Sequence, residues 1–160
     1  MFFMTRSPLY VRRARTSDAD VITTFNLALA AESEGRRLSP EIVARGVRRV
    51  LADPSRGVYY VAERAGRVVG QLLVTFEFSD WRDAVFWWIQ SVYVLPECRR
   101  QGILRTLYDH VVAEARRSGE ACGLRLYVDR RNTGARRVYE RLGLRATEYV
   151  VYELDWTLRE

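Results

Sequence analysis

The stretch Phe86–Val94 constrains the fold of this 160-residue chain most strongly. It contains three aromatic residues in its first half and alternates β-branched residues in its second, a composition that favours strands. The apolar residues at its start occupy both alternating positions, as in a strand that is buried on both faces. We therefore expect a central strand over residues 84–94, with the chemistry of the protein located where such strands end.

The other periodicities along the chain alternate between strands and helices. Their order predicts an α/β (α+β) domain in which helices pack against a mixed sheet. A hydrophobic content of 48% allows one sizeable core, so we expect a single domain over 1–160, with 1–8 as a frayed terminus. The expected strands are 9–13, 58–63, 68–78, 84–94, 124–128 and 149–154, and the expected helices are 16–31, 39–52, 102–118 and 132–142.

Composition limits the kind of protein this is. The longest apolar run, Ala84–Ile89, is far shorter than the roughly 20 residues that span a bilayer, so no membrane association is expected. Cys98 and Cys122 stand apart with only His110 as a further soft ligand, which predicts no metal site and fits a reducing cytoplasm. The 26 basic residues exceed the 20 acidic ones, and their guanidinium groups suit a phosphorylated partner or simply the solvated faces of helices.

A basic loop follows the predicted central strand and leads into a helix. The first turn of that helix carries unpaired amide hydrogens, which attract phosphate groups. Pro96 prevents the loop from pairing as a strand, and Gly102 allows a ligand to approach the backbone. Arg99, Arg100 and Arg105 add positive charge. The sequence therefore predicts an anion-binding site, although a lone R-x-x-G is more often an ordinary strand-to-helix turn.

The surrounding pattern, Val94-x-Pro96-x-x-Arg99-x-x-Gly102-Ile103, resembles the acetyl-CoA signature of the GNAT superfamily of N-acetyltransferases. Leu104 stands where the family pattern has a second small residue. The resemblance implies the GNAT fold, a mixed, mostly antiparallel sheet of six to seven strands with about four helices on both faces. It also implies acetyl-CoA as the co-substrate, with pyrophosphate on the loop amides and pantetheine along the strand. The implied cofactor-binding residues are Val92, Tyr93, Val94, Arg99, Arg100, Gln101, Gly102, Ile103, Leu104 and Arg105.

A second segment, Asn132-x-x-Ala135-x-x-x-Tyr139, resembles the second cofactor motif of the same superfamily. From spacing alone, Asn132 is an N-cap and Tyr139 packs in a core. The resemblance implies instead that Asn132 contacts the pantetheine arm and that Tyr139 is the general acid that protonates the leaving thiolate.

The residue that removes the proton from the amine is not evident. Many relatives carry a glutamate on the central strand where this chain has Gln90, and an amide is not a useful proton acceptor. We expect Gln90 to bind the substrate or a relay water. The candidates for the base are Glu77, which we favour, Asp80 and Asp83 in the turn that follows it, and Glu32 or Glu34 in the connection between the first two helices. Solvated turn charges are the alternative for these acids. For the acceptor pocket we expect Glu32, Glu34, Trp81 and Trp88.

These features together predict an acetyl-CoA dependent N-acetyltransferase that acts on a primary amine of a small molecule or peptide. A non-catalytic acyl-CoA sensor is the first alternative, because Gln90 replaces the usual base. A basic nucleic-acid-binding domain is the second and weaker one, since no helix-turn-helix, zinc or RNA-recognition motif accompanies the arginines. A homodimer through the last strand is common among relatives and is expected only on that ground.

Overall fold

The computed structural model describes residues 7–157, so residues 1–6 of the predicted frayed terminus lie outside the described part. The chain divides into two compact units, Met1–Tyr127 and Val128–Glu160.

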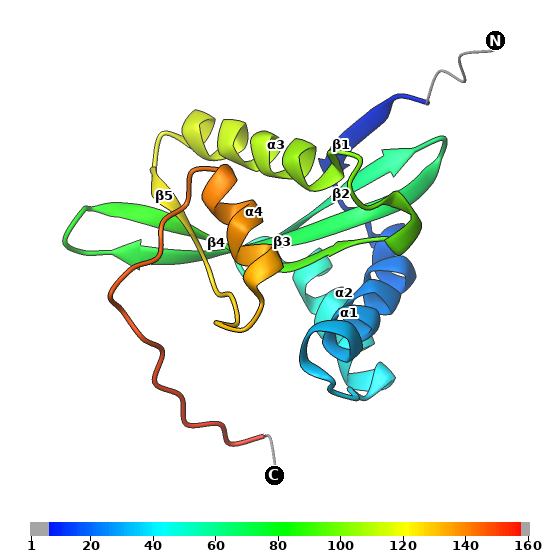
Figure 1. The fold of residues 1–160 in the computed structure, drawn as a ribbon, viewed down its shortest axis with the longest axis horizontal. Helices are drawn as coiled ribbons and strands as arrows, with labels where there is room; N and C mark the ends of the chain where they lie inside the picture. Colours follow the sequence, from blue (N-terminus) through cyan, green and yellow to red (C-terminus); the bar gives the residue numbers. More distant parts are fainter. Residues whose placement is uncertain (1–6, 158–160) are drawn as a thin grey trace. The chain divides into compact units, whose positions relative to one another are not determined.

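The first unit is built around a five-stranded sheet with the order β1-β2-β3-β4-β5 (Figure 1). The first four strands pair antiparallel with their neighbours, whereas β5 runs parallel to β4. β4 is a central strand, as the sequence predicts. The strands are β1 (Leu9–Arg13), β2 (Val58–Arg64), β3 (Arg67–Ser79), β4 (Ala84–Val94) and β5 (Ala121–Leu126).

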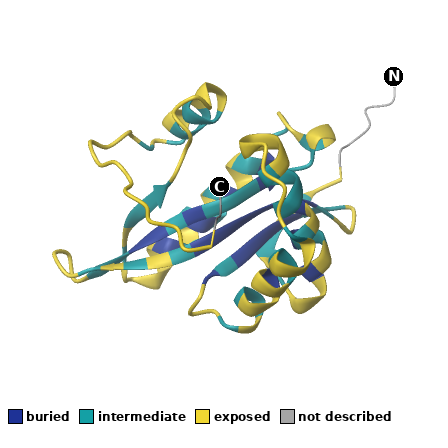
Figure 2. Cartoon of the chain, turned by 90° about the horizontal axis from the view of Figure 1, so that it is seen from below, coloured by how far each residue is buried: buried dark blue, intermediate teal, exposed yellow. Residues whose placement is uncertain are grey.

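Helices cover both faces of this sheet. α1 (Ala19–Glu34) and α2 (Pro40–Ala52) pack on one face, and α3 (Ile103–Ser118) packs on the other (Figure 1). Successive side chains of β2 point to opposite faces of the sheet and so contribute to two separate core clusters. Tyr59 belongs to the cluster under α1 and α2, and Tyr60 belongs to the cluster under α3. Figure 2 shows that the buried residues concentrate in the strands and on helix surfaces that face them.

Local sequence signals account for the element ends. Ala65 and Gly66 both have positive φ, 50° and 74°, so they form the two-residue turn that joins β2 to β3. Ser39 caps α2 by accepting a hydrogen bond from the amide of Ile42, and Pro40 occupies its first turn. Short 3-10 helices, Thr16–Asp18 (η1) and Pro96–Cys98 (η2), precede α1 and α3. The predicted hairpin and helix start are thus confirmed.

The prediction of six to seven strands is wrong for the described residues, which form five. The segment 149–154 has the composition of a strand, but no other strand takes up its backbone hydrogen bonds, and its side chains are mostly exposed. The fifth strand also begins earlier than predicted, at Ala121 and not at Leu124. Gly123 lowers its strand propensity, yet a Cβ there would lie 3.0 Å from the Phe86 ring, so any larger residue would have to displace that ring.

The second unit contains α4 (Thr133–Arg141). Asn132 caps this helix, because its side-chain oxygen accepts a hydrogen bond of 3.0 Å from the amide of Ala135. The capping role that the sequence predicts for Asn132 is therefore confirmed. No helix within residues 7–157 has the length and hydropathy required to cross a membrane.

Candidate active site

Among residues 7–157, no strand pairs with the C-terminal half of β4 on its β5 side. β5 pairs with β4 only as far as Ile89 and Leu126, whereas β4 continues to Val94. A bulge in the pairing with β3 lies in the same stretch, where Ser91 has a φ of +49°. Residues 90–94 therefore present a backbone edge that can pair with an extended ligand.

The loop 95–102 connects this edge to the start of α3. Arg100 and Gly102 adopt left-handed conformations, with φ of 61° and 80°, and Gly102 is the N-cap residue of α3. No capping side chain bonds the first-turn amides, which are free of helical partners by position. The loop thus ends in a set of amide hydrogens that can bind phosphate oxygens.

Gly70 fixes how closely α3 approaches the sheet, and sequence reasoning missed it. A Cβ at this position would lie 3.1 Å from the Ile103 side chain and 3.2 Å from the carbonyl oxygen of Tyr93. Both contacts are tighter than ordinary packing, so a side chain here would have to displace α3 or β4 by a few tenths of an ångström. The signal in the sequence was a single glycine inside an otherwise apolar strand.

Arg99 already has partners within the protein. Its Nε donates to the carbonyl oxygen of Val94 at 2.9 Å, and its guanidinium contacts the Glu32 carboxylate at 2.6 Å. The Tyr93 hydroxyl donates to the other oxygen of Glu32 at 3.0 Å. Arg99 lowers the pKa of Glu32, and burial, with the adjacent carboxylate, raises the pKa of Tyr93. Glu32 therefore links the end of α1 to the 95–102 loop.

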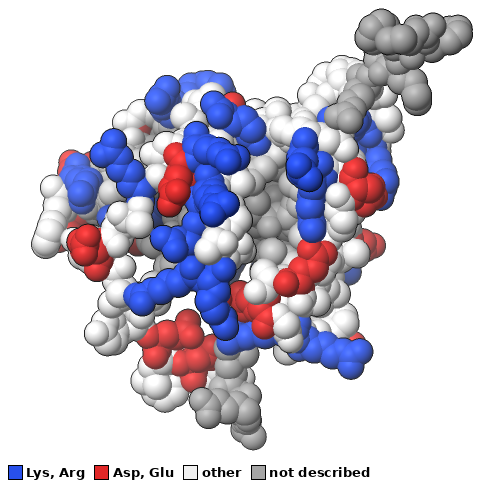
Figure 3. Space-filling model, in the orientation of Figure 1, with Lys and Arg blue, Asp and Glu red and all other residues white. Residues whose placement is uncertain are grey.

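The other predicted cofactor residues surround the same helix start. The side chain of Gln101 accepts a hydrogen bond of 2.7 Å from Arg64, a cation that sequence reasoning did not include. Arg105 pairs with Asp109 one turn later in α3. Arg100 has no ion pair among the described residues and is exposed. On the face of the molecule that Figure 3 shows, arginine side chains predominate and acidic side chains lie among them.

Gln90 and Glu77 lie on the same face of the sheet but apart. Gln90 donates to the Thr75 hydroxyl at 2.6 Å. Glu77 accepts hydrogen bonds from the Trp88 indole at 2.8 Å and from Arg125 at 2.7 Å, so both of its oxygens have donors. Leu73 is the residue of β3 opposite Gln90. Glu77 lies four residues further along β3, so the two positions are separated by roughly 13 Å along the strand.

The predicted acceptor residues are spread over the first unit. Trp81 is 86% exposed in the turn between β3 and β4, at the opposite end of β4 from the 95–102 loop. Trp88 stacks on Tyr127 with ring centroids 4.5 Å apart. Glu34 lies at the end of α1 and lines a cavity between α1, α2 and the sheet. The structure thus brings Glu32 to the loop and Glu34 to a pocket, and it leaves Trp81 at a hairpin tip.

Tyr139 lies on α4 in the second unit. Burial raises the pKa of its hydroxyl above the ordinary value of tyrosine, so the phenol remains protonated at neutral pH. Among the described residues, no group of three or more His, Cys, Asp or Glu side chains could hold a metal ion.

The mixed sheet with helices on both faces matches the fold of solved acetyltransferase structures. The model of the acetyltransferase (GNAT) family matches residues 24–144, which is most of the chain. The protein therefore belongs to the GNAT family of acetyltransferases. No curated protein matches the chain.

Solved structures agree with this assignment. A protein described as "a possible acetyltransferase" from Clostridium difficile 630 is 39% identical, with a TM-score of 0.87, over 92% of this chain and 97% of that one. A predicted acetyltransferase with acetyl-CoA from Clostridium acetobutylicum is 19% identical, with a TM-score of 0.75, over 92% and 96%. An aminoglycoside acetyltransferase from an uncultured soil sample, in complex with trehalose, is 20% identical, with a TM-score of 0.74, over 94% and 97%. The last two share the fold.

Proposed function

We propose that the protein transfers an acetyl group from acetyl-CoA to a primary amine of a small molecule or peptide. The observation that carries this proposal is the unpaired edge of β4, residues 90–94, followed directly by the amide-rich start of α3. An acyl-pantetheine arm requires an extended backbone partner, and its pyrophosphate requires clustered donors. The family match crosses the boundary between the two units, which supports one functional domain.

We further propose that pyrophosphate binds the amides of Gly102, Ile103, Leu104 and Arg105, with charge from Arg99 and Arg100. Val92 and Val94 pair with the pantetheine through their backbones, and Asn132 contacts the same arm. The carbonyl oxygen of Val94 accepts from Arg99, so Val92 offers the freer main-chain groups. Acetyl-CoA supplies an activated acyl group with a thiolate leaving group.

Direct transfer in a ternary complex requires no covalent enzyme intermediate. The amine nitrogen forms the new bond to the acyl carbon as the carbon–sulfur bond breaks, and Tyr139 donates its proton to the departing sulfur. Gln90 positions the amine or a relay water that carries the amine proton away. Glu77 is a base only through such a relay, because both of its oxygens are hydrogen bonded and it lies distant along β3.

Calorimetric titration with acetyl-CoA and CoA, followed by thiol release against a panel of amines, tests this function. The sequence contains no lysine, so thiol release without added amine reports hydrolysis and not acetylation of the protein's own lysine side chains. Binding with amine-dependent release is expected. Binding without release would support the sensor alternative, and absence of binding would contradict the proposal.

A further inference from the structure

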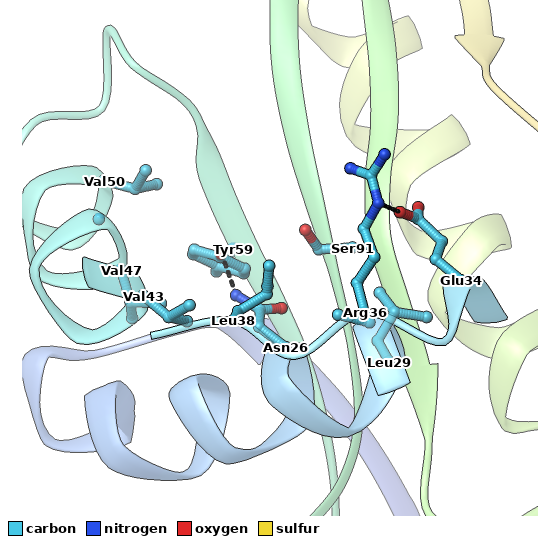
Figure 4. A pocket seen from close by; sticks show the side chains of 12 residues that line it. Asn26, Leu29, Glu34, Arg36, Leu38, Val43, Val47, Val50, Tyr59 and Ser91 are labelled. Atoms are coloured by element: carbon cyan, nitrogen blue, oxygen red, sulfur yellow. Dashed lines mark hydrogen bonds and ion pairs between the residues drawn. The ribbon is translucent and has the colours of Figure 1, made fainter. Parts of the chain in front are cut away.

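A cavity of about 490 Å³ lies between α1, α2 and the sheet, next to the bulge in β4 (Figure 4). The cavity is open to solvent, and its volume lies within the range of small-molecule sites. Hydrocarbon side chains form its walls: Leu29, Leu38, Val43, Val47 and Val50. A ligand that buries apolar surface against these walls gains affinity in proportion to the area that is removed from water.

The floor of the cavity is polar and held in place by a buried network. The Asn26 amide donates to the Tyr59 hydroxyl at 3.0 Å, and Gln71, which is fully buried, donates to the Asn26 oxygen at 2.7 Å and to the Ser91 carbonyl at 3.2 Å. Ser91 and Tyr59 both line the cavity at this floor (Figure 4). Burial raises the pKa of Tyr59, so the floor is neutral at physiological pH.

The floor adjoins the unpaired edge of β4, because Ser91 belongs to both. A polar head group at Ser91 is therefore placed beside the strand segment at which we propose the thioester binds. A ligand with such a head group has the apolar walls, including Leu38, available for the rest of its surface.

The charges of the cavity argue against a polycationic ligand. Of the residues that line the cavity, only Glu34 is acidic. The guanidinium of Arg36 lies 3.5 Å from the Glu34 carboxylate (Figure 4). The lining is thus electrically balanced, in a protein whose net charge is +6. Polyamines and aminoglycosides carry several positive charges and require several acidic partners.

We propose that this cavity is the acceptor site and that it selects a monoamine with a compact hydrocarbon body. The amine nitrogen faces Ser91 and Tyr59, and the hydrocarbon body lies against Val43 and Val47. This inference rests on the proposed function for the identity of the reaction, but binding of the amine does not depend on turnover.

The test is calorimetry of amines with the CoA-saturated protein, with 3-methylbutylamine, ethylamine and spermidine as probes. Three additional carbons contribute about 0.8 kcal/mol each when buried, so 3-methylbutylamine is expected to bind at least tenfold more tightly than ethylamine. Spermidine is expected to bind more weakly than 3-methylbutylamine. Equal affinities, or preference for spermidine, would overturn the inference.

A pair of variants on one helix locates the binding. Val43→Phe fills the cavity and should lower the affinity for 3-methylbutylamine at least tenfold, while Ile42→Phe, at an exposed position outside the lining, should leave it unchanged. Both variants should retain their affinity for CoA. Gly46→Ala is the milder second variant, because its new methyl group meets no atom within 4 Å and still adds volume at the lining. It should weaken the same amine severalfold, and equal binding by all three variants would contradict the proposal.

The outcomes separate this inference from the function. Amine binding that is sensitive to Val43→Phe, but without thiol release, would support the pocket and contradict acetyl transfer. Thiol release with spermidine that is insensitive to Val43→Phe would support acetyl transfer and overturn the pocket.

Discussion

At the scale of single residues, Gly102 determines the shape of the proposed phosphate site. Its φ of 80° lies in the left-handed region, and a Cβ there would meet no atom within 4 Å. Steric exclusion by the protein is therefore not the reason for glycine. Glycine is favoured here because it adopts the left-handed conformation without strain. It also leaves space above the amides for a ligand.

Gly102→Ala should consequently lower the free energy of unfolding by about 1 kcal/mol and weaken acetyl-CoA binding severalfold. Gly134→Ala is the control, because Gly134 lies in the first turn of α4 without a left-handed φ, and alanine there should raise the stability slightly. Urea denaturation and calorimetry measure the two effects. Opposite signs of the stability change are expected, and unchanged acetyl-CoA affinity in Gly102→Ala would contradict the phosphate site.

Tyr139 is the residue for which packing and catalysis predict different results. If it protonates the leaving thiolate, Tyr139→Phe should lower kcat about 100-fold and leave the Kd of acetyl-CoA nearly unchanged. Tyr149→Phe removes a hydroxyl from an exposed side chain in the same unit and should leave kcat unchanged. Single-turnover kinetics at saturating acetyl-CoA measure the chemical step. An unchanged rate in Tyr139→Phe would assign the residue to packing alone.

At the scale of elements, sequence patterns predicted what depends on local chemistry. Ser39-Pro40 and Asn132 marked helix starts correctly, because capping involves residues only a few positions apart. The aromatic and β-branched run of β4 identified a central strand for the same reason. Segment 149–154 has equally strong strand propensity and forms no strand, since pairing depends on a distant partner that propensity does not encode.

The parts of the candidate site that depend on contiguous residues were likewise predictable from the sequence, and the parts that join distant residues were not. The 95–102 loop and the helix start follow from a contiguous motif. The polar floor of Asn26, Tyr59 and Ser91, with Gln71 buried behind it, does not, because this network joins four elements that only the fold brings together. Its signal in the sequence was one glutamine and one serine inside apolar strands, which indicates a buried hydrogen bond but not its partner.

The junction of β1 and α1 is held by a buried carboxylate. Asp18 receives two hydrogen bonds from the Arg12 guanidinium, at 2.7 and 3.0 Å, and one of 2.6 Å from the Arg15 amide. Burial alone would raise the pKa of Asp18, but these hydrogen bonds outweigh it and lower the pKa. Its contribution to stability is therefore present above the unfolded-state pKa, about 3.9, and is lost as the pH falls through the folded-state value.

Asp18→Asn should lower the free energy of unfolding by about 2 kcal/mol at pH 7, because the amide cannot hold the guanidinium as a carboxylate does. The difference between wild type and variant should shrink as the pH falls below about 4, where the wild-type carboxylate itself becomes protonated. Urea denaturation between pH 3 and pH 7 measures this. A difference that is independent of pH would show that Asp18 acts through packing.

At the scale of the whole molecule, the positive charge can attract the cofactor in two ways: through particular arginines at the 95–102 loop, or through the overall field of the protein. The net charge of +6 attracts any polyanion, including nucleic acid, through a long-range field. A site for coenzyme A requires in addition that particular arginines lie beside the helix start. Arg99 and Arg105 are paired with acids, whereas Arg100 has no ion pair among residues 7–157.

Arg100→Gln should therefore weaken acetyl-CoA binding about fivefold to tenfold at low ionic strength, by removing one charge-assisted contact to phosphate. Arg116→Gln removes the same charge near the other end of α3, roughly 20 Å away, which exceeds the screening length at physiological salt. Calorimetry at 20 and 150 mM NaCl distinguishes the two variants. At 150 mM salt only Arg100→Gln should lower the affinity, whereas equal losses in both variants would mean that the general field of the protein, and not the 95–102 loop, attracts the cofactor.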